Sequence, residues 1–181
     1  RGRQFKQVAV DQSSEVRRVF NLREYLEEIL TSLRPELKRT KHLVELDVPA
    51  DIELKSYPGA LTQVIVNLVM NSLIHGFEGI EVGIISVRAR LNGSSVALTF
   101  ADTGVGLSAQ VRARIFDPFF TTKRGQGGSG LGMHIVYNLV TGVLGGSIQA
   151  GGSEGHGIEI LMSLPLAAPL SPPAPAAQPS A

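Results

Sequence analysis

Four polar side chains follow one face of a predicted helix: Gln63, Asn67, Asn71 and His75. Their spacing of four residues aligns them along the helix. Asparagine is only a middling helix former, yet two asparagines lie inside this helix. A carboxamide oxygen is a hard, neutral ligand that can complete a Mg²⁺ shell otherwise filled by phosphates and waters. The row therefore fits a site for a metal-bound phosphate ligand, and a merely solvated helix face is the alternative.

An acidic residue followed by two glycines ends a later predicted strand, in the order Asp102-Thr103-Gly104-Val105-Gly106. A buried carboxylate at this point can accept a hydrogen bond from an exocyclic amine such as adenine N6. The glycines would let the backbone approach a flat ring because no Cβ stands in the way. Taken alone, the motif fits an ordinary Asp-Thr-Gly turn better than a ligand site.

The segment from Phe116 to Lys123 is polar but contains three phenylalanines. A free loop gains nothing from exposing aromatic rings, so we expect them to anchor a lid to the body of the domain in one state. Donors for phosphate oxygens follow at once, namely the Thr121 and Thr122 hydroxyls and the Lys123 ammonium. The segment therefore predicts a lid over the phosphates.

A glycine cluster from Gly125 to Gly132 then opens another predicted helix. Backbone amides at a helix N-terminus bind anions well when side chains leave them accessible. The run also matches the dinucleotide fingerprint G-x-G-x-x-G, but that motif must follow a strand, and here the letters FFTTKR precede it. We therefore interpret the cluster as a phosphate-side helix start.

The remaining histidines do not add a metal site. His42, His134 and His156 are scattered along the chain and lie far in sequence from the polar row. His75 is the only histidine on that row, and we expect it to contact the bound nucleotide.

Composition limits the classes of protein that fit. The chain has 181 residues, 43% hydrophobic residues, a formal net charge of +1 and no cysteine. These values suit one domain with a real core and argue against a nucleic-acid binder. Disulfide and thiolate–metal frameworks are excluded. The sequence has no apolar run long enough for a membrane span, and no signal peptide or initiator Met, so we expect a fragment of a longer protein.

The expected elements are helices and a largely antiparallel sheet. Asn21 should cap the first helix and Pro35 should kink or end it. Asn92-Gly93 is a hairpin turn signal between two alternating runs. Helices and strands are segregated, which favours an α+β two-layer sandwich. The expected strands are 42–48, 52–55, 83–90, 95–101, 147–150 and 157–164, and the later helices are 58–75 and 131–144.

The order of the motifs resembles one known family. NLVMNSLIHG, DTGVGL, FDPFFTTK and GSGLGMHIV resemble the N, first glycine, F and second glycine boxes of sensor histidine kinases. The similarity is to their ATP-binding catalytic domain, a member of the wider GHKL (Bergerat-fold) ATPase group, over residues 20–166. It implies a mixed, mostly antiparallel sheet covered by helices on one face, with a mobile ATP lid. Residues 1–19 would be the remnant of an upstream helical region or linker, and 167–181 a disordered tail rich in Pro and Ala.

The resemblance also implies roles for individual residues. Asn71 would bind Mg²⁺, and Asn67 would act beside it near the phosphates as the catalytic residue. Asp102 would recognise adenine in a pocket shaped by Gly104 and Gly106. The remaining nucleotide contacts would come from His75, Thr121, Thr122, Lys123, Gly128, Ser129, Gly130, Leu131 and Gly132, and Gly155 and Gly157 resemble a third glycine element.

One position separates transfer from hydrolysis. The ATP-hydrolysing members of the group carry a glutamate as general base four residues before the metal-binding asparagine. Asn67 occupies that position here, and an amide cannot take a proton at neutral pH. The resemblance therefore implies a kinase that passes the γ-phosphoryl group of ATP to a histidine on a separate dimerisation hairpin.

Several expectations about partners follow from this resemblance. The phosphoryl group would pass on to the receiver domain of a response regulator, and the full-length protein would be a homodimer. We expect a cytoplasmic domain, which could be the cytoplasmic portion of a membrane-bound sensor. No histidine precedes His42, so this fragment should not phosphorylate itself. An anti-sigma-type serine kinase and a non-enzymatic nucleotide-sensing module are the alternative functions.

Overall fold

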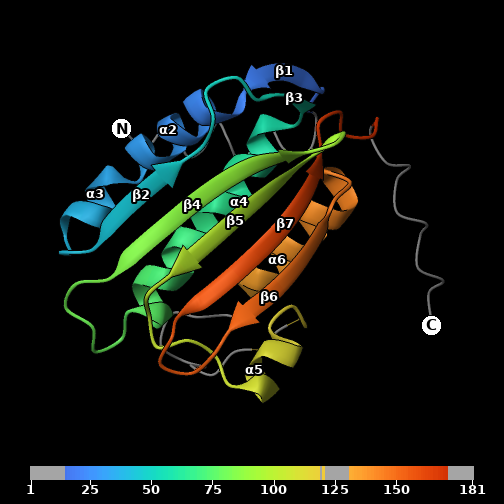
Figure 1. Cartoon of the computed structure of the whole chain (residues 1–181). Helices are drawn as coiled ribbons and strands as arrows, with labels where there is room; N and C mark the ends of the chain where they lie inside the picture. The colour runs from blue at the N-terminus through green and yellow to red at the C-terminus, as the bar shows by residue number, and fades with distance from the viewer. Residues whose placement is uncertain (1–14, 119, 121–130, 171–181) are drawn as a thin grey trace.

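The main sheet of the fold has five strands and is covered on one face by helices. The computed structural model describes residues 15–118, 120 and 131–170. The five strands lie in the order β2-β4-β5-β7-β6. Strands β2 and β4 are parallel, and all other neighbours are antiparallel. The strands are β2 (Leu43–Asp47), β4 (Ile84–Asn92), β5 (Ser95–Asp102), β7 (Ile158–Pro165) and β6 (Ser147–Gly152). The predicted two-layer α+β sandwich with a mixed, mostly antiparallel sheet is confirmed (Figure 1).

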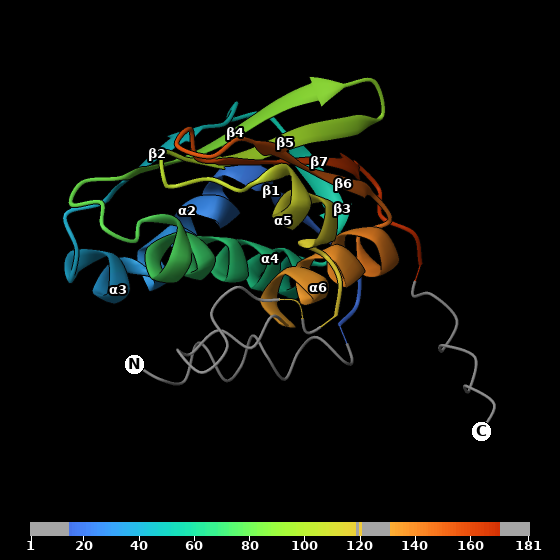
Figure 2. The same ribbon diagram turned by 90° about the horizontal axis from the view of Figure 1, so that it is seen from below.

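Three longer helices form the second layer beneath the sheet (Figure 2). Two of them continue as a single π-helical turn, so that the chain remains helical beyond each regular helix. The helices are α2 (Leu22–Ser32), α4 (Pro58–Asn71) with η1 (Ser72–Gly76), and α6 (Leu131–Asn138) with η2 (Leu139–Val143). Short helices α3 (Arg34–Lys38) and α5 (Ala109–Arg114) complete the described part. Sequence reasoning missed α5, although Ser108 caps it by accepting from the Val111 amide.

Local signals set where the helices begin and end. The Asn21 side chain accepts a hydrogen bond from the Glu24 amide at 2.9 Å, which confirms the predicted N-cap of α2. That helix ends at Ser32, and Pro35 lies in the first turn of α3, where a missing N–H costs nothing. Pro58 begins α4 in the same way.

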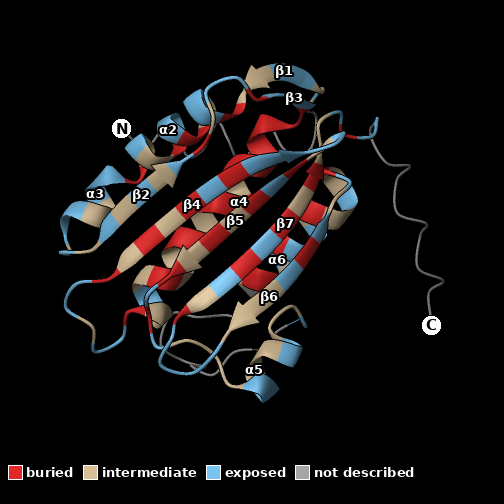
Figure 3. Ribbon diagram, viewed as in Figure 1, coloured by how far each residue is buried: buried red, intermediate tan, exposed pale blue. Residues whose placement is uncertain are grey.

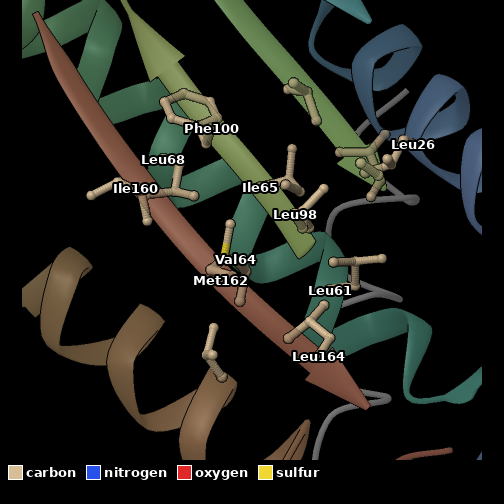
Figure 4. Packing of buried hydrophobic residues seen from close by; sticks show 14 of the residues in the cluster. Leu26, Leu61, Val64, Ile65, Leu68, Leu98, Phe100, Ile160, Met162 and Leu164 are labelled. Carbon is tan, nitrogen blue, oxygen red and sulfur yellow. The ribbon is translucent and has the colours of Figure 1, made fainter. Parts of the chain in front are cut away.

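The core lies between the sheet and the helices, and strand alternation decides which residues enter it (Figure 3). On β5, the side chains of Val96, Leu98 and Phe100 are buried against the helices. They pack with strand β7 against helix α4, as Figure 4 shows for Leu98, Phe100 and Ile160 beside Ile65 and Leu68. Continued alternation by two residues brings Asp102 onto the same buried face.

The β4–β5 hairpin differs slightly from the prediction. Asn92 pairs with Ser95, so the two turn residues are Gly93 and Ser94 rather than Asn92 and Gly93. Gly93 has a φ of 63°, a left-handed conformation that glycine adopts without strain. The turn therefore lies one residue later than predicted, and Gly93 is the first of its two central residues instead of the second.

A small second sheet holds both ends of the described chain. Strand β1 (Arg18–Asn21) pairs antiparallel with β3 (Glu53–Ser56), so this pairing includes residues 18 and 19 of the stretch expected to be an upstream helical remnant or linker. On the other edge of β3, the Lys55 amide donates to Leu166 O at 2.7 Å, and Lys55 O accepts from the Ala168 amide at 2.8 Å. The segment after β7 thus lies along the free edge of β3, opposite β1.

Side chains reinforce the contact between the two chain ends. Arg17 Nη1 donates to Ala168 O at 2.6 Å, and the Tyr57 hydroxyl donates to Pro169 O at 2.8 Å. Glu15 Oε1 accepts from the Gly59 amide at 2.6 Å in the first turn of α4. Residues before 20 and after 166, the expected limits of the domain, thus also pack against the fold.

Candidate functional site

The site is built around the Asp102 carboxylate at the end of β5, which is only 6% exposed. Within the described residues, three donors reach this carboxylate. The Ser72 hydroxyl donates to Oδ2 at 2.7 Å, and the Gly104 and Ile158 amides donate to Oδ1 at 2.9 and 3.2 Å. An ionised carboxylate can accept about four hydrogen bonds. The described donors fill both acceptor positions on Oδ1 and one on Oδ2, so one position on Oδ2 remains.

Close-packed glycines surround that carboxylate. A Cβ on Gly104 would lie 2.2 Å from Gly76 O, and a Cβ on Gly76 would lie 2.7 Å from Asp102 Oδ2. Gly106 has a φ of 72°, and a Cβ there would lie 2.0 Å from Ser153 O. The sequence predicts that Gly104 and Gly106 let a ligand ring approach the backbone. The structure adds a different reason, which is that the protein backbone itself needs the space.

The loop between β6 and β7 closes one side of this arrangement. The Gly155 amide donates to Val105 O at 2.7 Å, while the Val105 amide donates to Gly76 O at 2.8 Å. A Cβ on Gly157 would lie only 1.8 Å from Asp102 O. The glycines at 155 and 157, assigned from the family resemblance alone, therefore lie directly against the Asp102 turn.

The polar row on α4 faces the start of α6. Gln63 Nε2 donates to Asn67 Oδ1 at 2.8 Å, and Asn67 Nδ2 donates to Gly132 O at 3.3 Å. The Asn71 carboxamide lies 3.5–3.6 Å from the position that a Cβ on Gly132 would occupy. All four members of the row, including His75 in η1, are partly buried. Asn67 and Asn71 thus lie at a junction between two helices and not on a freely solvated face.

Ser72 is the site residue that sequence reasoning missed. It follows Asn71 directly and begins the π-helical turn η1, in which the Phe77 amide donates to Ser72 O at 2.9 Å. Its side chain is 2% exposed. The only signal in the sequence was a small polar residue next to the polar row. The carboxylate that accepts from its hydroxyl is 30 residues away, at the end of a strand.

The start of the predicted lid is held to α6 by Phe116. Its ring lies 5.6 Å from that of Tyr137, and its carbonyl accepts from His134 Nδ1 at 3.3 Å. His134 Nε2 lies 3.1 Å from Asn138 Nδ2, and the tautomer with its proton on Nδ1 satisfies both contacts. Phe116 thus makes the kind of anchoring contact that the sequence predicts for the aromatic residues of this segment.

Several predicted site residues lie outside the described residues. They are Thr121, Thr122, Lys123, Gly128, Ser129 and Gly130, and the Leu131 side chain is also not described. Their roles stay sequence-based predictions. Among the residues that the structure does describe, no group of three or more His, Cys, Asp or Glu side chains is arranged to hold a metal ion. Within the same residues, no helix has the length and apolarity needed to cross a membrane.

Comparison with known proteins identifies the family. Residues 57–168 match the family described as histidine kinase-, DNA gyrase B-, and HSP90-like ATPases. The sensor histidine kinase ZraS of Escherichia coli O157:H7 is 38% identical over 115 residues, which cover 63% of this chain and 24% of ZraS. The chain thus spans about a quarter of the length of this curated relative.

Solved structures give the same result for the fold. The catalytic domain of histidine kinase ThkA superposes with a TM-score of 0.73 at 25% identity, covering 84% of this chain and 97% of that domain. A structure of ThkA in complex with the response regulator protein TrrA matches with a TM-score of 0.69 at 19% identity, over 90% of this chain and 47% of that chain. The resemblance to the ATP-binding catalytic domain of sensor histidine kinases is thereby confirmed, and the chain belongs to the histidine kinase-, DNA gyrase B-, and HSP90-like ATPase family.

Proposed function

We propose that this domain binds ATP with Mg²⁺ and donates the γ-phosphoryl group to a histidine on a separate dimerisation hairpin. One observation carries the proposal. The buried Asp102 carboxylate keeps one acceptor position on Oδ2, and the residue that holds this oxygen, Ser72, directly follows Asn71. An acceptor at the buried end of the site suits the exocyclic amine of adenine, while the amide row suits the phosphate end.

The described residues divide between these two ends. Asp102 would accept from the adenine amine, and Gly104 and Gly106 would keep the surrounding turn in shape. Asn71 would supply the protein oxygen to Mg²⁺, for which a neutral carboxamide is a suitable ligand. Bound Mg²⁺ would neutralise negative charge on the phosphates. The other proposed contacts on the phosphate side are His75, Leu131, Gly132 and the predicted lid residues Thr121, Thr122, Lys123, Gly128, Ser129 and Gly130.

Asn67 argues for transfer over hydrolysis. Its amide accepts from Gln63 and donates to Gly132 O, so both ends of the carboxamide are held by neighbouring groups. An amide in that position orients groups but cannot deprotonate a water. In the transfer step, an imidazole nitrogen of the acceptor forms a bond to the γ-phosphorus. The bond to the β,γ-bridging oxygen breaks, and ADP leaves.

The proposed partners complete a two-component system. The related kinase ThkA is known in complex with the response regulator TrrA, and we propose a receiver domain of that kind as the final phosphoryl acceptor. Because the acceptor hairpin also dimerises in such kinases, we propose that the full-length protein is a homodimer. The domain would act in the cytoplasm, where ATP is available.

A two-stage experiment tests this function. The chain is first titrated with a non-hydrolysable ATP analogue, with and without Mg²⁺. It is then mixed with labelled ATP and a helical hairpin that carries the acceptor histidine. We expect Mg²⁺-dependent binding and an acid-labile phosphohistidine on the hairpin. The control hairpin has glutamine in place of that histidine and should remain unlabelled.

Other outcomes would contradict the proposal in distinct ways. Acid-stable phosphoserine in a supplied protein would favour the serine kinase. Tight binding without any transfer would favour a nucleotide-sensing module. Absence of binding would reject the site itself. The chain without hairpin serves as a further control, and label on one of its own histidines would contradict transfer in trans.

A further inference from the structure

The Ser72–Asp102 hydrogen bond carries an inference about how the base is selected. Both side chains are buried, at 2% and 6% exposure, and the Oγ to Oδ2 distance is 2.7 Å. An ionised carboxylate can only accept, so the Ser72 hydroxyl is the donor. Hydrogen bonds from O–H to a carboxylate are among the stronger ones in proteins.

The two oxygens of Asp102 are held by different kinds of group. Oδ1 accepts from the Gly104 and Ile158 amides, which belong to the backbone and leave the geometry of this oxygen little freedom. The terminal torsion of an Asp side chain is otherwise broad. Holding Oδ1 alone leaves the carboxylate plane free to rotate, so a second hydrogen bond, to Oδ2, is needed to fix its orientation. The Ser72 hydroxyl is the described group that provides it.

The helix geometry explains why Ser72 can do this while its neighbour serves the phosphate side. Successive helical residues point about 100° apart. Asn71 lies beside Gly132 on α6, whereas Ser72 points to the end of β5. Ser72 also begins the π-helical turn η1, and such turns are frequent at functional sites. Adjacent residues of one helix thus reach the two ends of the site.

We propose that Ser72 is a positioning residue for base selection, which rests on the ATP binding proposed above. Its hydroxyl orients Asp102 so that the remaining acceptor position on Oδ2 faces the 6-amino group of a purine. A 6-oxo purine would present an oxygen to that position, and two acceptors repel. A purine without a 6-substituent would leave Oδ2 unpaired. Ser72 therefore contributes to affinity only when the ligand carries the amine.

Two triphosphates separate this role from a merely structural one. ATP and purine riboside 5′-triphosphate differ by the 6-amino group, so a residue acting through that group affects only ATP. Calorimetric titration of the 181-residue chain with Mg²⁺ should show that Ser72→Ala weakens ATP binding about 5- to 10-fold, which is less than the loss of a direct hydrogen bond to a charged group because Ser72 acts on the base only through Asp102. Binding of the analogue should change by less than about twofold. Equal losses for both ligands would overturn the proposal.

Two further variants make the result decisive. Thr62→Val is the matched control, because it removes a buried hydroxyl of α4 that contacts Tyr25 at 2.7 Å and not Asp102. It should leave the ratio of the two affinities unchanged. Ser72→Cys keeps a weak donor of similar size and should give a smaller loss, again for ATP alone. If Ser72→Ala does not fold, the cysteine variant still decides the question.

The wild-type titration distinguishes this inference from the proposed function. If wild-type protein binds both triphosphates equally well, Asp102 does not read the amine and the role of Ser72 is rejected, although ATP binding stands. If wild-type protein binds neither triphosphate, the proposed function itself fails.

Discussion

The Cα of Gly157 packs directly against the backbone carbonyl of Asp102, so that an added Cβ would lie 1.8 Å from that oxygen. No real Cβ tolerates such a distance from a backbone oxygen. The contact joins the loop after β6 to the last residue of β5. It therefore makes the position of Asp102 depend on a residue 55 positions later in the chain.

Gly157→Ala should accordingly destabilise the fold by more than about 3 kcal/mol, because overpacking adds to the cost of a left-handed conformation. Gly155→Ala is its matched control. The two glycines have nearly equal φ values of 78° and 77°, but a Cβ on Gly155 would meet nothing within 4 Å. That control should cost only about 1–2 kcal/mol. Urea denaturation measures both, and equal losses would show that backbone conformation alone matters.

Asp102→Asn should change which base the site prefers. The Gly104 and Ile158 amides would hold the asparagine oxygen, which leaves the NH₂ group facing Ser72 and the ligand. The NH₂ would repel the adenine amine and could donate to a 6-oxo group. ATP affinity should fall about 10- to 100-fold, as for a lost hydrogen bond to a charged group. Inosine triphosphate should instead bind more tightly to the variant than to wild type in the same calorimetric titration, because a donated hydrogen bond replaces the repulsion between two acceptors.

The control for this variant is Asp47→Asn. Asp47 is exposed on β2, where the Arg90 guanidinium lowers the pKa of its carboxyl. Loss of that surface pair should leave both nucleotide affinities unchanged. An Asp102→Asn protein that bound ATP as tightly as wild type would contradict the proposed base site.

Asn71→Ala should remove most of the benefit of Mg²⁺ for nucleotide binding. With Mg²⁺, ATP affinity should fall about tenfold, which corresponds to ~1.4 kcal/mol. With EDTA, the variant and wild type should bind ATP alike, because the amide acts through the metal. Fluorescence titration with Mg²⁺ and with EDTA gives the ratio of wild-type to variant ATP affinity under each condition. Asn92→Ala in the exposed β4–β5 hairpin is the control, and an equal loss without Mg²⁺ would exclude a metal-ligand role for Asn71.

Stability should fall at high pH through Tyr25. Burial raises the pKa of this phenol above its usual value of about 10, although the Thr62 hydrogen bond acts in the opposite direction. The folded state therefore holds the proton more tightly than the unfolded state. The resulting stabilisation is fully present below pH 10 and is lost as pH rises through the folded pKa.

Tyr25→Phe tests this dependence because phenylalanine cannot ionise. The difference in unfolding free energy between wild type and variant should be constant up to about pH 9 and should then move in favour of the variant. Urea denaturation at several pH values measures it. Tyr137→Phe, which changes a tyrosine that is 41% exposed, provides the comparison. Parallel curves for wild type and Tyr25→Phe would contradict the effect.

Local patterns explain how much of the fold the sequence could predict. Alternation identified the strands, and Asn21, Pro35 and Pro58 marked helix boundaries because caps and prolines act on their immediate neighbours. Strand β1 escaped prediction because its partner β3 lies more than 30 residues away. The hairpin turn was misplaced by one residue because Gly93 could occupy either central position.

In the site, too, local patterns could be predicted from the sequence and long-range contacts could not. Asp102 and the asparagines of α4 stood out because their types and spacing suggest chemistry. Ser72 did not, since its role depends on a contact with Asp102 that only the folded chain creates. Likewise, nothing local in the sequence reveals that Gly104 and Gly157 are required by backbone packing.

Strand β3 receives both the beginning and the end of the described chain, since it pairs with β1 on one edge and with residues 166–168 on the other. The Arg17–Ala168 hydrogen bond brings the two ends together. In topological terms the described fold is almost a closed ring. A circular permutant that joins Pro169 to Glu15 through a short glycine-rich linker, and opens the chain between Gly93 and Ser94, would keep every strand pairing.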